Sequence, residues 1–363
     1  MSKAAELAAL IGSQSALSNR NLIINGACVI DQRNAGASVT PNLLAYPVDR
    51  IFGFGSVTGK FSCQQNSGSV TPPVGFSNYI GAVSLSAYSV GSAEQYIFGQ
   101  PIEGLNVTHL EWGTSSAATV TLSFYVRSSL TGTFGGSLQN SAFDRSYPFS
   151  YTISTANTWE RKTITIVGDT SGTWLKTNGV GIRVGFSLGA GSSVSGTAGA
   201  WASGNFVSAT GATSVVGTNA ATLYITGISL EIGEQATPFE HRSFGDELKQ
   251  CERYYEKTYE YGTVAGTPES YPTNMGMRMN GFDLASGQRY MVFRLRTEKR
   301  ARPTNTYYGH LGNSGKISTA DAGGTLTERN LGLSVTSTSM VGGGSSNGAY
   351  AGLMLYVVSD AEL

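Results

Sequence analysis

One short motif in the sequence resembles the turn that carries a nucleophilic serine. Residues Gly344–Gly348 have the pattern G-x-S-x-G, in which Ser346 would be the nucleophile. Such a serine needs a strand before the turn and a helix after it, whereas here a Gly- and Ser-rich loop leads into another apolar strand. A chain with 47 glycines matches this pattern easily by chance. We therefore do not expect a serine hydrolase.

Other patterns of catalytic or ligand-binding residues are weaker. Residues Gly55–Lys60 have the wrong spacing for a phosphate-binding loop, and Phe61 stands where Ser or Thr would hold magnesium. The three histidines, His109, His241 and His310, are far apart and lack the spacing of metal ligands. The sequence therefore predicts no catalytic residue, no cofactor and no metal site.

Paired carboxylates for glycoside cleavage are an alternative, because the distance that matters between them is spatial. The candidates are Asp144, Asp169, Asp283 and Asp321. Aspartates in loops more commonly form turns and caps. The chain also lacks the fixed-period repeats of a β-helical depolymerase. A polysaccharide-cleaving enzyme is therefore only a minor alternative.

Aromatic residues in uncharged loops are the stronger functional candidates. Sugars present apolar patches and hydroxyl groups, which aromatic side chains with neutral or carboxylate neighbours can bind. Trp174 is expected to pack in a core, whereas tyrosines among Pro, Gly and Asn residues are expected to be exposed. The glycan-binding candidates are Tyr271, Tyr307, Tyr308, Tyr350, Trp201 and Phe206.

The charge balance excludes several kinds of partner. The 363 residues include 24 Lys+Arg and 24 Asp+Glu, which gives a formal net charge of +0 at pH 7. Binding to nucleic acid or to an anionic membrane surface depends on clustered positive charge. No apolar run approaches the ~18 residues of a membrane-spanning helix. We therefore expect neither nucleic-acid binding nor membrane insertion.

The amino terminus and the cysteines bear on the compartment of synthesis. Residues 1–12 lack a continuous apolar stretch and carry Glu6, unlike a secretory signal. Cys28, Cys63 and Cys251 are too few and too scattered for a zinc site or a disulfide framework. They are interpreted as reduced, buried thiols of a protein made in a cytoplasm.

Strands are the elements expected to position the candidate residues. Only 13% of the residues are charged, about half of the usual ~25%. Apolar and polar residues alternate in Thr119–Arg127 and Val180–Leu188, and again at Ile164 and Ile166. This alternation is typical of antiparallel sheet with one buried face. With turn clusters between the strands, the pattern predicts an all-β, mainly antiparallel protein with a jelly-roll β-sandwich over residues 21–242.

One glycine is predicted to interrupt the alternation. Leu223 and Ile225 occupy one parity of a strand, whereas Ile228 and Leu230 occupy the other. Because a shift of one residue moves side chains to the opposite face, Gly227 is expected to form a bulge that resets the register.

Two short helices are expected beside the sheets. Within residues 1–20, Ser2–Gly12 has apolar residues at helical spacing, and its about three turns are marginal alone in water. This segment is predicted to attach to a partner or to its own copies, with a frayed terminus as the alternative. A connecting helix is predicted over Asp246–Tyr261, within a linker of residues 243–261, and Ser243 with Asp246 resembles a capping box.

Residues 262–363 are predicted to form a second, distal β-domain. Its last strand, Leu353–Val358, is apolar on both faces. Such a strand is either central in a core or buried against another subunit. The candidate oligomerisation and attachment residues are Leu355 and Val357 in this strand, and Leu7, Leu10 and Ile11 near the amino terminus.

Several segments together resemble the tail-fibre or receptor-binding proteins of tailed bacteriophages that contain a carbohydrate-binding-module-like jelly roll. The most specific is YITGISLEIGEQATPFEHRSFGDELKQCERYYEK at Tyr224–Lys257. The others are NLIINGACVIDQR at Asn21–Arg33, YPVDRIFGF at Tyr46–Phe54, QYIFGQPIEG at Gln95–Gly104, TVTLSFYVRSSLTGTF at Thr119–Phe134, TWERKTITI at Thr158–Ile166, FRLRTEKRARPT at Phe293–Thr304 and the terminal SDAEL.

The resemblance implies a function in host attachment. It implies non-covalent adhesion to a bacterial surface polysaccharide or lipopolysaccharide, without catalysis, by a homotrimer in the virion tail that is synthesised in the host cytoplasm. Residues 1–20 would join other phage tail proteins. Residues 262–363 would be the receptor-binding head, because the loops at Gly262–Met279, Tyr307–Thr325 and Gly342–Tyr350 are long and polar. The main alternative is a purely structural virion protein, a fibre adaptor or capsid or tail decoration, without glycan affinity.

Overall fold

The computed structural model describes residues 20–269, 277–279, 288–320, 325–330, 332–335, 339–345 and 352–363. Contacts within the chain divide it into two units. The first contains the residues up to Asp31, Gly36–Phe244 and Leu363. The second contains Gln32–Ala35 and Gly245–Glu362.

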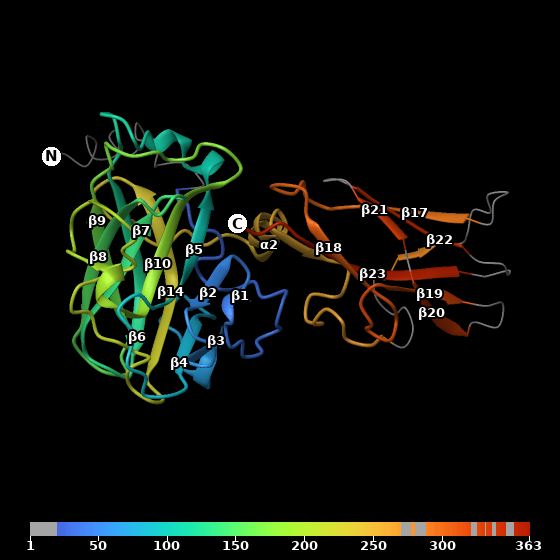
Figure 1. Ribbon diagram of the computed structural model, residues 1–363, viewed down its shortest axis with the longest axis horizontal. Helices are drawn as coiled ribbons and strands as arrows, with labels where there is room; N and C mark the ends of the chain where they lie inside the picture. Colours follow the sequence, from blue (N-terminus) through green and yellow to red (C-terminus); the bar gives the residue numbers. More distant parts are fainter. Residues whose placement is uncertain are drawn as a thin grey trace. The chain divides into compact units, whose positions relative to one another are not determined.

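The first unit is a sandwich of two antiparallel sheets (Figure 1). In spatial order, the seven-stranded sheet consists of β1 (Leu43–Val48), β2 (Ile51–Gly55), β5 (Gln95–Glu103), β10 (Val180–Ala190), β7 (Gly132–Gln139), β8 (Arg145–Ile153) and β12 (Ala202–Ser203). The five-stranded sheet consists of β3 (Phe61–Gln65), β4 (Ile80–Ser84), β14 (Thr222–Ile232), β6 (Val120–Ser128) and β9 (Glu160–Ile166).

Short elements complete this unit. A parallel pair, β11 (Ser195–Gly196) and β13 (Ser208–Ala209), lies in the long connection between β10 and β14. The single-turn helices are η2 (Ser67–Ser69), η3 (Gly104–Asn106), η4 (Thr108–Leu110) and η5 (Ser192–Val194).

Alternating apolar residues from both sheets form one core. Phe124 of β6 and Phe186 of β10 belong to opposite sheets, and their ring centroids are 4.9 Å apart. The chain passes between the sheets from β6 to β7, from β8 to β9 and from β9 to β10. The predicted all-β, antiparallel jelly-roll sandwich is therefore confirmed. All three cysteines are buried thiols, as predicted.

Gly227 forms the predicted interruption of β14. The register between β14 and β6 shifts between Thr226 and Ser229, and Gly227 has a left-handed φ of +62°. A Cβ at this position would lie 2.7 Å from Cζ of Phe76. Both the backbone conformation and the close approach therefore favour glycine.

The described residues of the second unit form one helix and two further sheets. Its elements are α2 (Phe244–Glu252), β15 (Tyr255–Lys257), β16 (Met277–Met279), β17 (Gln288–Arg294), β18 (Thr304–Tyr308), β19 (Lys316–Ala320), β20 (Leu326–Asn330), β21 (Gly332–Val335), β22 (Ser339–Ser345) and β23 (Gly352–Asp360). Strand β23 pairs with β15, β16, β18 and β19. Strand β22 pairs with β17 and β21.

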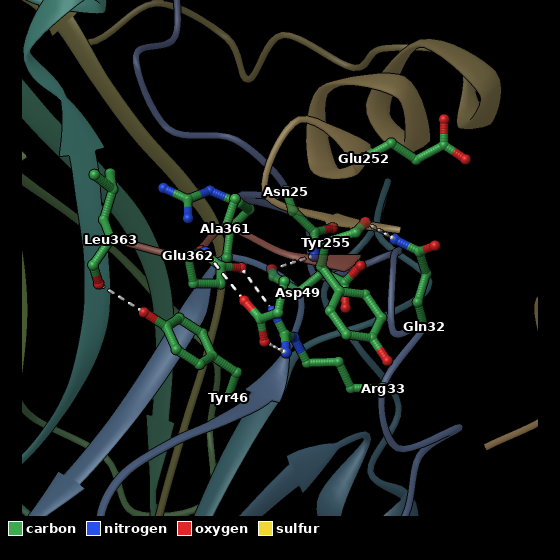
Figure 2. A network of polar contacts seen from close by, with 12 residues as sticks. Asn25, Gln32, Arg33, Tyr46, Asp49, Glu252, Tyr255, Ala361, Glu362 and Leu363 are labelled. Carbon is green, nitrogen blue, oxygen red and sulfur yellow. Dashed lines mark hydrogen bonds and ion pairs between the residues drawn. The ribbon is translucent and has the colours of Figure 1, made fainter. Parts of the chain in front are cut away.

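Polar contacts connect distant segments of the second unit (Figure 2). The amide Nε2 of Gln32 donates to the carbonyl of Tyr255 at 3.1 Å. Arg33 forms ion pairs with Asp360 at 2.7 Å and with Glu362 at 3.2 Å. Residues Gln32–Ala35 therefore belong to this unit although they precede β1 in the chain.

The connecting helix is shorter than predicted. It ends at Glu252, and Tyr255–Lys257 form strand β15, which pairs with the end of β23. The aromatic residues Tyr255 and Tyr259 satisfy a helical spacing, but aromatic side chains also favour strands. Pairing with β23 selects the strand conformation, and the local spacing of residues does not show that this pairing exists.

The predicted amino-terminal helix, with Leu7, Leu10 and Ile11, lies outside the described residues. Within the described part of the chain, no helix has the length and apolar character needed to cross a membrane.

Candidate functional site

The outer face of the seven-stranded sheet carries the candidate site. Strand β10 lies between β5 and β7 (Figure 1). Its inward residues Ile182, Val184 and Phe186 are buried in the core, so Arg183 points to the outer face. Strand pairing places Pro101 of β5 and Gln139 of β7 on either side of Arg183.

Arg183 is held between aromatic rings. Its guanidinium carbon lies 4.6 Å from the ring centroid of Phe143 and 5.2 Å from that of Phe52, within the range of cation–π attraction. The side chain is half-buried, and burial lowers the pKa of Arg183. Its Nε atom is buried and has no hydrogen-bond partner among the described residues.

The turn after β7 positions the Phe143 ring. Asn140 is fully buried, and its Nδ2 donates to Asp144 at 2.6 Å and to the carbonyl of Thr173 at 3.1 Å. Phe143 has a φ of +58°, which is uncommon for a bulky residue. The anchored turn therefore holds Phe143 in a conformation that a free loop would rarely adopt.

Small residues of three neighbouring strands lie next to Arg183 on this face. Gly185 follows two positions along β10 and pairs with Gly99 of β5 and Ser137 of β7. A Cβ built at Gly185 would meet only the carbonyl oxygen of Ser137, at 3.9 Å. A methyl group would therefore fit at this buried position, two residues from Arg183.

Amide and aromatic groups border Arg183 on the β7 side. The Nε2 of Gln139 donates to Oδ1 of Asn205 at 2.7 Å. The backbone N–H of Phe206 donates to Oγ of Ser146 at 3.0 Å. We call Arg183, Phe143, Gln139, Asn205 and Phe206 the Arg183 surface; all but the buried Gln139 are partly exposed.

Phe206, a candidate from the sequence, borders this surface through its backbone N–H, and its ring lies beside Gly196 and Gly204. Trp201 lies elsewhere. The Trp201 ring packs against Trp112, Trp174 and Tyr147, with centroid distances of 5.2, 5.3 and 5.2 Å. Its indole N–H donates to the carbonyl of Val167 at 2.7 Å. Trp201 therefore helps to close the core. Trp174 is buried, as expected from the sequence.

The tyrosines predicted in the distal loops lie elsewhere. Tyr307 and Tyr308 are in strand β18, paired with β23, and both are half-buried. The Tyr308 ring lies 6.0 Å from that of Tyr259, and burial raises the pKa of Tyr308. Their expected exposure in a loop is therefore corrected, because β23 pairs with the segment that holds them. Tyr271 and Tyr350 lie outside the described residues.

The candidate oligomerisation residues of the last strand are buried within a single chain. Leu355 and Val357 are each 3% exposed. Strand β23 has paired strands on both sides. Its two apolar faces therefore agree with the prediction of a strand central in a core, rather than one buried against another subunit. Neither side chain offers exposed surface to a partner.

The two candidate carboxylates that the structure describes, Asp144 and Asp169, both make contacts within the sandwich. Asp169 is 1% exposed and binds Arg145 through two hydrogen bonds, Nε–Oδ2 at 2.8 Å and Nη2–Oδ1 at 2.6 Å. Asp144 is exposed and accepts a hydrogen bond from Asn140. Asp283 and Asp321 lie outside the described residues. Within the described ranges, no group of three or more His, Cys, Asp or Glu side chains is placed to hold a metal ion.

Four members of the Arg183 surface were not predicted from the sequence: Arg183, Phe143, Gln139 and Asn205. Arg183 was visible only as a polar residue in an alternating strand. The groups around Arg183 come from strands and a turn that are distant in sequence, so no local pattern indicates them.

Comparison with known proteins gives only remote similarities. The sequence matches no protein-family model and no curated protein. The enzymatically active domain of bacteriophage CBA120 tailspike protein 4 is 10% identical, with a TM-score of 0.30 over 59% of this chain, and the chain spans only 22% of that protein. A family 11 carbohydrate-binding module from Clostridium thermocellum, in complex with a mixed-linked tetrasaccharide, is 10% identical, with a TM-score of 0.28, covering 54% of this chain and 97% of the module.

Such low scores do not establish a common fold. The substrates and ligands of those proteins are therefore not assigned to this chain.

Proposed function

We propose that this protein is a non-enzymatic, glycan-binding protein of a phage tail, which adheres to a bacterial surface polysaccharide or lipopolysaccharide. The observation that carries the glycan-binding part is the Arg183 surface. It combines partly exposed aromatic rings with amide and guanidinium donors on a rigid sheet, and this is the usual make-up of a small-molecule site.

Binding at this surface would be non-covalent. The rings of Phe143 and Phe206 would contact the apolar face of a sugar, and Asn205 would hydrogen-bond to its hydroxyl groups. Because β10 is central in the sheet and Asn140 anchors the Phe143 turn, these groups are held in place before the glycan binds. Such preorganisation lowers the entropy cost of binding.

The phage-tail part of the proposal is supported by the sequence segments that resemble tail-fibre proteins. In that setting residues 1–20 join other tail proteins, and the assembled protein is a homotrimer. Three copies would increase weak single-site binding through avidity. Light scattering at micromolar concentration tests this state, and a monomeric mass would contradict it.

Binding of the labelled, natively assembled protein to a panel of bacteria tests the function. We expect selective binding that soluble polysaccharide from the bound strain inhibits. Phe143→Ala should weaken this binding, whereas Phe244→Ala, at an exposed phenylalanine outside the Arg183 surface, should not. A correctly assembled protein that binds no cell and no polysaccharide would contradict adhesion and favour a structural virion protein.

A further inference from the structure

The outer face of the seven-stranded sheet contains a guanidinium, that of Arg183, which no acidic side chain among the described residues pairs with. The Arg183 side chain makes no hydrogen bond or ion pair with the described residues, and its guanidinium lies over the rings of Phe52 and Phe143. A guanidinium has five N–H donors in a planar fork. Half-buried donors of a charged group are normally paired.

The strand positions beside Arg183 carry no acidic side chain. Its neighbours across the sheet are Pro101 and Gln139, and the next position on the same face of β10 is Gly185. The titratable group that interacts with Arg183 is the phenol of Tyr46. The Tyr46 hydroxyl is itself engaged, because it donates to the main-chain carboxylate oxygen of Leu363 at 2.9 Å (Figure 2).

Two positions along β10 from Arg183, the buried Gly185 leaves space for a methyl group. The nearest atom to a Cβ at Gly185 would be 3.9 Å away. An arginine fork binds the two oxygens of a carboxylate or phosphate in a bidentate manner, and such charge-assisted bonds are stronger than neutral ones.

We propose that Arg183 binds an anionic group of the glycan, a sugar carboxylate or a sugar phosphate, so that the Arg183 surface selects acidic over neutral polysaccharides. This inference rests on the proposed function and names its substrate class. The anion would fix the orientation of the sugar beside Phe143, whose ring and the neighbouring Asn205 would contact uncharged parts of the same residue.

Paired polymers that differ only in charge test the proposal. The probes are polygalacturonate with its carboxyl-reduced form, and phosphomannan with its dephosphorylated form, and dissociation constants are measured by calorimetry at low and moderate salt. We expect at least one anionic polymer to bind about tenfold or more tightly than its neutral form. The two pairs distinguish carboxylate from phosphate.

Three variants locate the effect. Arg183→Gln should abolish the preference for the anionic form, and Arg183→Lys, which keeps the charge but not the fork, should retain part of it. Arg161→Gln is the matched control, because exposed Arg161 lies on β9 of the other sheet and donates to the carbonyl of Thr237. It removes the same charge and should preserve the preference.

Each result decides for or against the inference. Equal binding of charged and neutral forms, no binding of either anionic polymer, or an equal loss in Arg161→Gln and Arg183→Gln would overturn it. Cell binding that neutral polysaccharide inhibits would leave the proposed function intact in those cases. Thermal unfolding of each variant separates loss of a ligand contact from loss of folding, and unchanged folding with lost preference supports the proposal.

Discussion

Replacement of Asp169 by asparagine should destabilise the sandwich strongly without changing its shape. The Asp169 carboxylate is 1% exposed and accepts two hydrogen bonds from Arg145, at 2.8 and 2.6 Å, and one from the backbone N–H of Ser171 at 3.1 Å. Asparagine has nearly the same volume, but it removes the charge and turns one acceptor into a donor that faces the guanidinium. Arg145 would then be a partly buried charge without its partner.

The size of the effect follows from the burial of both side chains. Loss of one partner from a buried ion pair costs about 3–5 kcal/mol. Because the Arg145 side chain is 16% exposed, water can solvate part of it, and we expect the lower end, about 3 kcal/mol. For a unit of this size that corresponds to a fall in Tm of about 6–12 °C.

Thermal unfolding followed by circular dichroism measures this difference. Asp144→Asn is the control, since Asp144 is exposed and accepts a hydrogen bond from Asn140, and its Tm should change by about 2 °C or less. Equal Tm values for the two variants would refute the structural role of Asp169. A stable Asp169→Asn protein that had lost polysaccharide cleavage would instead favour the enzyme alternative.

Three further predictions concern backbone packing and pH. Gly185→Ala should stabilise the first unit by about 0.4–1 kcal/mol. Gly99→Ala should cost about 3 kcal/mol or more, because its Cβ would lie 2.0 Å from a carbonyl oxygen of β10. Urea unfolding compares the two variants, and similar midpoints would contradict this prediction. Gly227→Ala should cost at least about 1–2 kcal/mol for its left-handed conformation, with a further cost from the Phe76 ring, and a Tm within ~1 °C of the parent would disprove this. The backbone N–H of Gly91 lowers the pKa of Glu94, and the hydroxyls of Tyr88 and Tyr96 add to this effect. The stability that the Glu94 carboxylate contributes is therefore complete above the ordinary pKa of ~4.3 and is lost as the pH falls through the lowered pKa. Glu94→Gln should lower Tm at pH 7 and differ less from the parent below about pH 4, and a difference in Tm that does not depend on pH would contradict this.

Local alternation predicted the sandwich because each strand of an antiparallel sheet with one buried face carries its own two-residue period. The parity change around Gly227 predicted the bulge for the same reason. The predicted end of the connecting helix was wrong because Tyr255 and Tyr259 fit a helix as well as a strand. The partner strand β23 begins about a hundred positions later in the chain. Where the local period fits both a helix and a strand, a pairing partner distant in sequence determines which of them forms.

The candidate site was harder to predict than the fold. The aromatic residues chosen from loops include one member of the Arg183 surface, Phe206, but sequence does not show which rings pack inward, as Trp201 does. Arg183 is distinguished by missing contacts rather than by a motif. Missing contacts depend on the side chains that neighbouring strands place around a residue, and only the assembled sheet shows them.

The burial of the native thiols makes this chain suitable for site-directed labelling. Cys28, Cys63 and Cys251 are each at most 1% exposed, and burial raises the pKa of the Cys63 thiol, so none should react readily with maleimide in the folded protein. A cysteine introduced at Val74, which is 100% exposed in the connection between β3 and β4, would be the preferred site of conjugation. That connection joins two strands of the five-stranded sheet, so a fluorophore there would report on cell binding without occupying the face that carries Arg183.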